Sequence, residues 1–569
     1  MVAEQLVEHD PERFVTTGLP GLDALLGGLR LGDNVVWRVD SIDDYRAFVA
    51  PYVAAAVAAG RRVVYIRFAS HPPVVETSGV GAVYDLDALR GFESFTVRLH
   101  TIIAEEGRRA FYVFDCLSDL LDAWATDGMI GNFFRVTCPY LFELDTLAYF
   151  SLRRGAHSMA TVDAIRSTTQ LLIDLYNESG ALYLHPLKVW QRYSPTMFLP
   201  HLHRDGQFTP ITASCEATSL FNRLAGSASD DPERYLDSWE RLFIRAGDLS
   251  ASGQDDPERQ AMVEQLCRLL IGRDERILAL ARRHFTLADL LAIKGRLIGT
   301  GFIGGKSVGM LLARAILQAD PESGWGEFLE PHDSFFIGSD LFHSHIVNNG
   351  CWQLFMRQRS EAGYSSSAAQ LRELLLQGAF PIEILREFQK MLEYFGQYPI
   401  IVRSSSLLED GFGNAFAGKY DSFFCVNQGS PEERLAQFIE AVRKVYASTL
   451  SEEALAYRQQ RGLARQEEQM ALLVQRVSGA YHGNYFFPAF AGVGISYNTF
   501  VWRHDIDPGA GMLRLVVGLG TRAVDRVDGD YPRIVSLDHP LLVPEPGLRR
   551  HADSHSLRDP GSSGKRHRQ

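Results

Sequence analysis

Residues 299–307 read GTGFIGGKS, and an amphipathic pattern follows directly after Lys306. The backbone N–H groups at a helix N-terminus attract anions, and Lys306 adds a full positive charge, so this turn is a candidate phosphate site. A glycine turn with a solvent-exposed lysine is the structural alternative. The apolar positions that predict the helix recur on one face, at Val308, Leu311, Leu312, Ala315 and Ile316.

A phosphate loop of the P-loop type is one interpretation of this turn. That pattern begins with glycine, where this chain has Thr300, and it follows a strand. Residues 287–297 have a helical pattern instead. The P-loop interpretation is therefore disfavoured.

A second polar cluster occurs further along the chain. Residues 399–406 read PIIVRSSS, a short apolar strand pattern that ends in Arg403 and three hydroxyl residues. Glu409 and Asp410 follow, and then the glycine-rich residues 411–421, GFGNAFAGKYD. The planar guanidinium group of arginine suits phosphate oxygens. The structural alternative pairs Arg403 with one of the two carboxylates.

Lys306 in its GGK turn, followed in order by VRSS, ED and FAG, resembles the N-terminal domain of pyruvate phosphate dikinase and phosphoenolpyruvate synthase. Further pieces follow in the family's order: VYAS at 445–448, AYR at 456–458, MALLVQRV at 470–477 and GLG at 518–520. The resemblance implies a two-lobed ATP-grasp domain over residues 298–545, with ATP and Mg²⁺ as cofactors.

The same resemblance implies roles for single residues. Lys306 and Arg403 would hold the phosphates and act in catalysis, and Gln475 would lie near the adenine. For Gln475, a polar position on the solvent face of a strand is the alternative. The full set of implied nucleotide-binding residues is Gly304, Gly305, Lys306, Arg403, Ser404, Ser405, Phe416, Ala417, Gly418 and Gln475.

Two departures from the family pattern bear on catalysis. The family follows GLG with a glutamate that helps to bind magnesium, and this chain has Thr521, whose hydroxyl is a poorer ligand. Asp525, Asp528 and Asp530 are candidate metal ligands in its place, or else form a solvated turn. No segment matches the family's phosphohistidine domain or its pyruvate-binding barrel. The phosphoryl acceptor is therefore expected in trans, on a partner protein or on a missing C-terminal domain.

The first 215 residues have strand and helix patterns that alternate, which predicts a parallel sheet. Residues 17–32, TGLPGLDALLGGLRLG, resemble the opening of RecA-like domains of the KaiC type. Where those domains carry their phosphate loop, residues 39–44 read VDSIDD, without glycine or lysine. We therefore expect a degenerate RecA-like domain over residues 1–215, acting as a scaffold or interaction module. Asp115 occupies the position of a magnesium-orienting acid, although such strand-end aspartates are common.

The local patterns of this domain predict strands at 34–39, 63–68 and 111–114 and a helix at 51–59 that stops at Gly60. A helical connector is expected over residues 216–297, with a loop at 250–256 and helix starts at the two DDPER pentamers, 230–234 and 255–259. Ser430 and Glu433 predict a capping box. Residues 546–569 are predicted to be a disordered basic tail.

The composition limits the class of protein. The chain has 569 residues, 46% hydrophobic and 22% charged, which is ordinary for soluble globular proteins. Its formal net charge of −12 disfavours a nucleic-acid binder, and no apolar run reaches the roughly 18 residues of a membrane span. The six cysteines are scattered, which fits a reducing cytoplasm. We expect a cytoplasmic α/β multidomain protein without nucleic-acid or membrane partners.

Two functions remain open from the sequence. The first is an ATP-binding phosphotransferase module of the dikinase type, in which Lys306, Arg403 and magnesium balance the charge of a transferring phosphoryl group. The second is a non-catalytic, nucleotide-sensing scaffold. Thr521 and the missing N-terminal phosphate loop favour the second function.

Overall fold

The computed structural model describes residues 14–123, 126–227, 236–252, 257–320, 322, 324–409, 418–524 and 532–542. The chain has a mixed α/β architecture with several sheets and many helices. It divides into two compact units. Unit 1 comprises Met1–Tyr394, Val402–Phe424 and Ser430–Gln475, and unit 2 comprises Phe395–Ile401, Cys425–Gly429 and Arg476–Gln569. The tail predicted at 546–569 lies outside the described residues.

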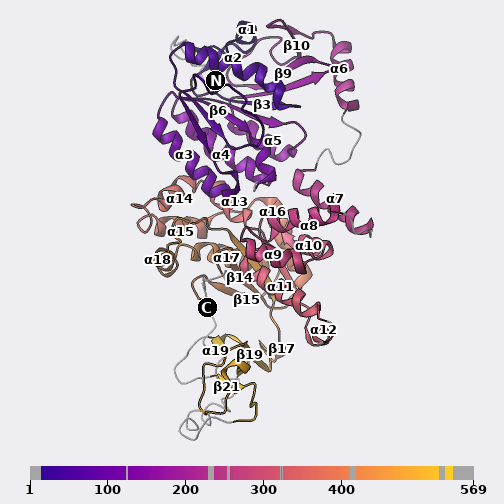
Figure 1. Cartoon of the computed structure of the whole chain (residues 1–569), viewed down its shortest axis with the longest axis vertical. Helices are drawn as coiled ribbons and strands as arrows, with labels where there is room; N and C mark the ends of the chain where they lie inside the picture. Colours follow the sequence, from indigo (N-terminus) through magenta and orange to yellow (C-terminus); the bar gives the residue numbers. More distant parts are fainter. Residues whose placement is uncertain are drawn as a thin grey trace. The chain divides into compact units, whose positions relative to one another are not determined.

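Unit 1 begins with a nine-stranded sheet, here called the N-terminal sheet, of which Figure 1 labels β3, β6, β9 and β10. The strand order is β11-β10-β9-β8-β3-β7-β6-β4-β5. Strands β3 to β8 pair in parallel, and β9 to β11 extend the sheet in antiparallel pairing. Its centre is made of almost wholly buried strands, as expected when both faces of a parallel sheet are covered. The strands are β3 (Asn34–Val39), β4 (Val63–Arg67), β5 (Ala82–Asp85), β6 (Phe111–Cys116), β7 (Leu147–Arg153), β8 (Leu171–Glu178), β9 (Ala181–Val189), β10 (His201–Arg204) and β11 (Gln207–Pro210).

The strands predicted at 34–39, 63–68 and 111–114 are therefore confirmed as β3, β4 and β6, with ends that differ by at most two residues. A short hairpin, β1 (Phe14–Val15) with β2 (Leu29–Arg30), precedes the sheet. The helices of this part are α1 (Pro20–Leu26), α2 (Ile42–Ala58), α3 (Phe92–Glu106), α4 (Asp127–Glu143) and α5 (Met159–Thr168).

The helix predicted at 51–59 begins earlier than expected. It is α2, which starts at Ile42 and contains Pro51 in its interior. The Ser41 side chain caps the helix by accepting the N–H of Asp43. The negative charges of Asp43 and Asp44 in the first turn also stabilise the helix, because they lie near the positive end of its dipole. These N-terminal signals outweigh the proline, whose usual place is the first turn.

A run of helices follows, as predicted for 216–297: α6 (Ser214–Ser227), α7 (Ser238–Ser252), α8 (Pro257–Leu270), α9 (Glu275–His284) and α10 (Leu287–Gly295). The loop predicted at 250–256 is wrong at its start, because α7 continues to Ser252. Pro257 of the second DDPER opens α8, as predicted, whereas the first pentamer lies outside the described residues. Buried side chains of α7 to α10 share one core with α11, β13 and β16.

The remainder of unit 1 is built on a five-stranded sheet, the central sheet, in the order β12-β13-β16-β14-β15. The strands predicted at 399–406 and 470–477 are confirmed as β14 and β16, and the Ser430 capping box is confirmed at the start of α17. The strands are β12 (Leu297–Ile298), β13 (Ser334–Ile337), β14 (Ile400–Ser406), β15 (Ser422–Cys425) and β16 (Met470–Arg476). The helices are α11 (Gly305–Gln318), α12 (Trp325–Phe328), α13 (Asp340–Asn348), α14 (Trp352–Arg359), α15 (Ala368–Gln377), α16 (Ile382–Phe395), α17 (Pro431–Ser448) and α18 (Glu452–Gln460).

Unit 2 is smaller and consists mainly of antiparallel strands. A hairpin joins β17 (Ala480–His482) to β18 (Tyr485–Phe487). A three-stranded sheet has the order β19-β20-β21, with bounds Phe490–Ile495, Met512–Val517 and Arg533–Ser536. The one-turn helix α19 (Thr521–Val524) follows β20.

Candidate functional site

A cavity of about 340 Å³ lies beside the N-terminal end of α11. Three elements of unit 1 supply its lining: the first turns of α11, strand β14 and strand β16. The lining residues are Gly305, Lys306, Gly309, Met310, Arg403, Leu473 and Gln475. The structure thus brings Lys306, Arg403 and Gln475 together at one cavity, although they are far apart in sequence.

The spacing of the lining residues follows from the two kinds of secondary structure. Gly305 and Gly309 are one helical turn apart and so share a face of α11 with Lys306. Leu473 and Gln475 alternate along β16 and therefore point to the same face of the sheet. β14, which carries Arg403, is the neighbour of β16 in that sheet.

The ammonium group of Lys306 is already engaged within the protein. It donates to Ser404 Oγ at 2.9 Å and to Glu409 Oε1 at 2.9 Å. Glu409 is 1% exposed, and burial raises its pKa, while the charge of Lys306 and hydrogen bonds act in the opposite direction. The Lys306 side chain keeps 18% of its surface exposed. The positive charge of Lys306 thus lies at the cavity and is paired with the buried carboxylate of Glu409.

Arg403 and Gln475 are neighbours at the other wall. Arg403 Nη1 donates to Gln475 Oε1 at 3.3 Å, and Gln475 Nε2 donates to Ser334 Oγ at 3.1 Å. The sequence predicted phosphate contact for Arg403 and adenine contact for Gln475. In this structure the two side chains contact each other. A nucleotide with its phosphates on Arg403 and its adenine beside Gln475 would have to break this hydrogen bond and form its own bonds to both side chains.

The two glycines of the GGK turn serve close backbone packing. A Cβ on Gly304, whose φ is +80°, would lie 1.3 Å from the carbonyl oxygen of Ser405. A Cβ on Gly305 would lie 2.2 Å from the carbonyl oxygen of Glu409. The glycines therefore allow the start of α11 to approach the end of β14, which sets Lys306 beside Glu409.

Ser404 and Ser405 are fully buried and do not line the cavity. Ser404 Oγ donates to Glu409 Oε1 at 2.9 Å. Ser405 Oγ accepts the N–H of Ser307 in the first turn of α11 and donates to the Ile303 carbonyl. These hydroxyls hold the turn and the strand end together, so their contribution to a nucleotide site is indirect.

Glu409 is the functional residue that sequence reasoning missed. In the sequence, Glu409 belongs to the ED pair and is a candidate partner for Arg403. The structure pairs it with Lys306 instead. No spacing rule connects two residues this far apart in sequence, so only the resemblance, which places ED next to VRSS, could have drawn attention to it.

Several predicted site residues fall outside the described part of the chain: Asp410, Phe416, Ala417, Asp525, Asp528 and Asp530. Gly418 is described, has φ +72° and does not line the cavity. Thr521 is exposed at the start of α19 in unit 2. Within the described residues, no group of three or more His, Cys, Asp or Glu side chains is arranged to hold a metal ion. We therefore assign no step to magnesium.

The carboxyl edge of the N-terminal sheet is filled by the protein's own groups. Asp115 accepts the N–H groups of Phe68 and Ala69 at 3.0 and 3.1 Å and the hydroxyl of Tyr65. Asp40 accepts from Arg154 at 2.7 Å, and Asp44 accepts from Asn177 at 2.7 Å. These aspartates hold the loops at the strand ends.

Ser118, His157 and Asp127 have the hydrogen-bond order of a Ser-His-Asp triad. Ser118 Oγ lies 2.8 Å from His157 Nε2, and His157 Nδ1 lies 2.8 Å from Asp127 Oδ1. Ser118 is only 4% exposed, however, and its Oγ also accepts the N–H of Arg153. Because a nucleophile must meet its substrate, we assign this buried network to structure.

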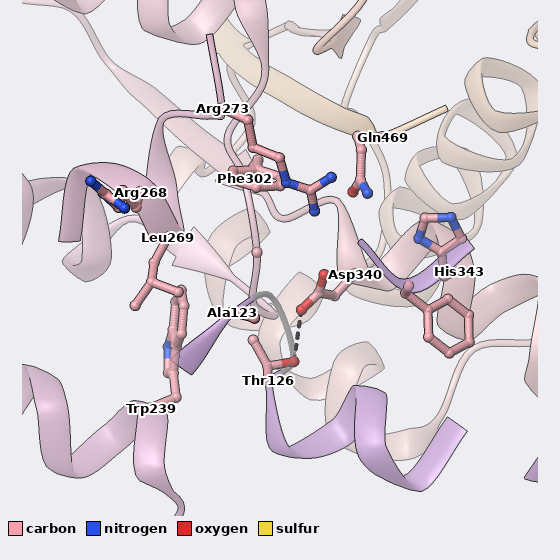
Figure 2. Close-up of a pocket in the computed structure, with 12 residues that line it drawn as sticks. Ala123, Thr126, Trp239, Arg268, Leu269, Arg273, Phe302, Asp340, His343 and Gln469 are labelled. Atoms are coloured by element: carbon pink, nitrogen blue, oxygen red, sulfur yellow. Dashed lines mark hydrogen bonds between the residues drawn. The ribbon is translucent and has the colours of Figure 1, made fainter. Parts of the chain in front are cut away.

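The residues that build the N-terminal sheet and its helices, 14–210, are here called the N-terminal sheet part. A smaller cavity, of about 20 Å³, lies where this part meets α13 (Figure 2). Asp340, Thr126, Arg273 and His343 are among its lining residues. Its volume suits about one water molecule and excludes a nucleotide.

Among the described helices, none has the length and apolar character needed to cross a membrane.

Comparisons with known proteins agree with the location of the larger cavity. Residues 300–558 match the family described as "Pyruvate phosphate dikinase, AMP/ATP-binding domain". A stretch of 154 residues is 25% identical to rifampicin phosphotransferase of Bacillus cereus, covering 26% of this chain and 17% of that protein. The predicted resemblance to this nucleotide-binding domain is thus confirmed. The family match supports an AMP/ATP-binding module in the C-terminal half of the chain.

Proposed function

We propose that this chain binds ATP in the cavity beside Lys306 and Arg403 and acts as the nucleotide-binding part of a phosphotransferase. The observation that carries the proposal is the convergence of two cationic side chains on one cavity, within the residues that match an AMP/ATP-binding family. Lys306 and Arg403 would neutralise phosphate oxygens, and the fork of Arg403 suits them geometrically.

The cavity has the mixed character that nucleotide sites need. Its volume of about 340 Å³ is at the lower end of ordinary ligand pockets. Met310 and Leu473 offer an apolar surface for a base, and Gln475 offers an amide for orientation. When bound, magnesium would supply further neutralisation of phosphate charge; Asp525, Asp528 and Asp530 remain its candidate ligands.

The fold assignments are part of the proposal. We infer an ATP-grasp domain over residues 298–545, after a helical connector at 216–297. We also infer a degenerate RecA-like domain over residues 1–215, with the parallel pairing of β3 to β8 as support. The phosphoryl acceptor would be a partner protein or a further domain acting in trans.

Calorimetric titration of ATP with magnesium into the purified chain tests the proposal. One site is expected, with AMP bound more weakly than ATP, because Lys306 and Arg403 should contact the outer phosphates. Lys444→Ala serves as the control, since Lys444 is a partly exposed lysine of α17 paired with Glu440. No heat of ATP binding, or equal affinities for AMP and ATP, would contradict the proposal.

A nucleotide-sensing scaffold without turnover is the second candidate. The specific observation in its favour is the contact of Lys306 with the buried Glu409, which offsets the charge available for a transferring phosphoryl group. Thr521, in place of a metal-binding carboxylate, points the same way. Binding of ATP without phosphoprotein or AMP formation would favour this candidate.

A further inference from the structure

A buried carboxylate joins the N-terminal sheet part of unit 1 to the part that carries the cavity. It belongs to Glu93, in the first turn of α3, which is 2% exposed. Its Oε1 lies 2.5 Å from Arg359 Nε at the end of α14. Its Oε2 accepts, at 3.2 Å, the N–H of Glu468, which lies two residues before the start of β16. One side chain thus holds two elements from the other part of the unit.

The contact is reciprocal, because the cavity-bearing part also caps α3. Glu467 Oε1 accepts the N–H of Glu93 at 3.0 Å, where a carboxylate is favoured by the helix dipole. Arg273 Nη1 lies 3.2 Å from the other oxygen of Glu467 and donates to the Arg90 carbonyl at 2.7 Å. Gly91, with φ +97°, makes room, since a Cβ there would lie 2.3 Å from Glu467 Oε2.

From Glu468 the buried polar contacts continue to the cavity. Glu468 Oε1 accepts the hydroxyl of Ser406, the last residue of β14. The N–H of Ser406 donates to Glu409 Oε2 at 2.9 Å. Glu409 Oε1 in turn accepts from Lys306 at 2.9 Å. Glu468, Ser406 and Glu409 are each at most 2% exposed, so water does not compete along this path.

We propose that Glu93 is a positioning residue for Lys306, acting through Glu468, Ser406 and Glu409. Each contact fixes the donor or acceptor of the next, and buried polar networks are sensitive to the loss of one member. The N-terminal sheet part would then set the geometry of the nucleotide site without touching the nucleotide. The effect on ATP rests on the proposed function; the effect on Lys306 itself does not.

The test compares Glu93→Gln with Glu106→Gln in the full chain. Glu106 is the matched control, because it lies at the other end of α3 and its carboxylate binds Arg62 and Tyr84 within the N-terminal part. The first readout is the rate at which an amine-acylating reagent labels Lys306, measured by mass spectrometry relative to Lys390, whose side chain is 70% exposed. The second readout is the Kd for ATP.

We expect Glu93→Gln to raise relative labelling of Lys306 and to weaken ATP binding, each by at least about three-fold, because the coupled groups lose their fixed geometry. Glu106→Gln should change neither quantity. In a Lys306→Ala background, Glu93→Gln should alter the Kd by less than about two-fold, since the effect passes through Lys306. If Glu93→Gln does not fold, Ser406→Ala interrupts the same path and should act in the same direction.

The outcomes separate the two proposals. If the unmodified chain binds ATP but neither labelling nor Kd responds to Glu93→Gln, the positioning role is wrong and Glu93 is only structural. If the unmodified chain binds no ATP, the proposed function is wrong. The relative labelling of Lys306 in Glu93→Gln then tests by itself whether Glu93 positions Lys306. A fall in melting temperature with unchanged labelling would also overturn the positioning role.

Discussion

The ammonium group of Lys306 lies 2.9 Å from Oε1 of Glu409, within the turn that the sequence marks as an anion site. The carboxylate is 1% exposed, so the attraction between the two groups is poorly screened. A nucleotide that binds here competes with Glu409 for the charge of Lys306. The strength of ATP binding should therefore depend on the carboxylate as well as on the lysine.

Glu409→Gln should tighten ATP binding. Glutamine keeps an acceptor oxygen for Lys306 at the position of Oε1, so the lysine keeps that contact while the negative charge is lost. Its amide nitrogen takes the place of Oε2 and loses the bond from the Ser406 N–H. The gain should be at least about 1 kcal/mol, roughly five-fold in Kd, because that is the attraction of two charges about 4 Å apart in bulk water and the buried carboxylate is screened less. Titration calorimetry at pH 7 checks this, with Glu106→Gln as the control. Weaker binding would mean that the carboxylate acts mainly by positioning.

Lys306→Ala and Arg403→Ala should each weaken ATP binding by about 1–3 kcal/mol, the scale of a hydrogen bond to a charged group. The double variant of the full chain should show no rise in melting temperature with ATP. That result is expected because residues 39–44 lack the glycine and lysine of a phosphate loop. A remaining thermal shift in the double variant would indicate a nucleotide site in the N-terminal part.

Gly304→Ala should destabilise unit 1 by at least about 3 kcal/mol, because it combines a left-handed backbone with a backbone clash. Gly309→Ala is the matched control on the same helix, since nothing lies within 4 Å of the Cβ it adds. That variant should gain roughly 0.5–1 kcal/mol from helix propensity. Urea unfolding of both variants measures the contrast. Equal stabilities would refute the close packing of the GGK turn.

The chain alone should bind ATP but form little phosphoprotein or AMP. The family resemblance implies a magnesium-binding carboxylate at the position where this chain has Thr521, so metal neutralisation of the transferring group should be weak. Thr521→Glu should raise magnesium-dependent ATP affinity. ATP labelled at the β-phosphate would reveal both products. AMP formation near 1 s⁻¹ or faster, as in kinases, would contradict the prediction and implicate Asp525, Asp528 or Asp530.

Two buried histidines should make the fold acid-sensitive. Burial lowers the pKa of His100 to about 3 and that of His345 to about 4. Below about pH 6.5 the unfolded chain takes up protons at these positions and the folded chain does not. The free energy of unfolding therefore decreases as the pH is lowered. Each histidine should contribute about 1.4 kcal/mol per pH unit between that value and its folded pKa.

The measurement is urea unfolding at several pH values between 4.5 and 7. His100→Gln should reduce the pH dependence by about one proton, because the substituted side chain does not titrate. His539→Gln, which changes an exposed histidine, should leave the dependence unaltered. An unchanged slope in His100→Gln would show that His100 takes up a proton in the folded chain.

Local signals in the sequence were sufficient for most of the elements that were predicted individually. Ser430 with Glu433 fixes the start of α17, and the apolar run at 34–39 fixes β3. The start of α2 was missed because Pro51 suggested a beginning there, while Ser41 and the following acids supplied the true one. The end of α7 was missed because serine and glycine at 250–253 resemble a loop, although the helix continues to Ser252.

The candidate site was predictable only in part. The GGK turn and the VRSS motif single out Lys306 and Arg403, and the structure brings both to one cavity. It could not tell that Ser404 and Ser405 would be buried, because the alternation of β14 ends at Arg403 and the following three residues are all buried. It also could not pair Lys306 with Glu409, since that contact depends on how closely two glycines let α11 approach β14.

The contacts at the start of α2 leave little freedom to place a phosphate loop at residues 39–44. Asp40 is bound to Arg154, and Asp44 is bound to Asn177, so both acids now tie α2 to the neighbouring strand ends. Replacing residues 39–44 by a glycine-rich, lysine-bearing loop would remove both ties at once. Introducing a nucleotide site at this edge would therefore require coordinated changes at positions 154 and 177. Such a site is beyond the reach of any single substitution, and a designer who wished to build it would have to rebuild three strand ends together.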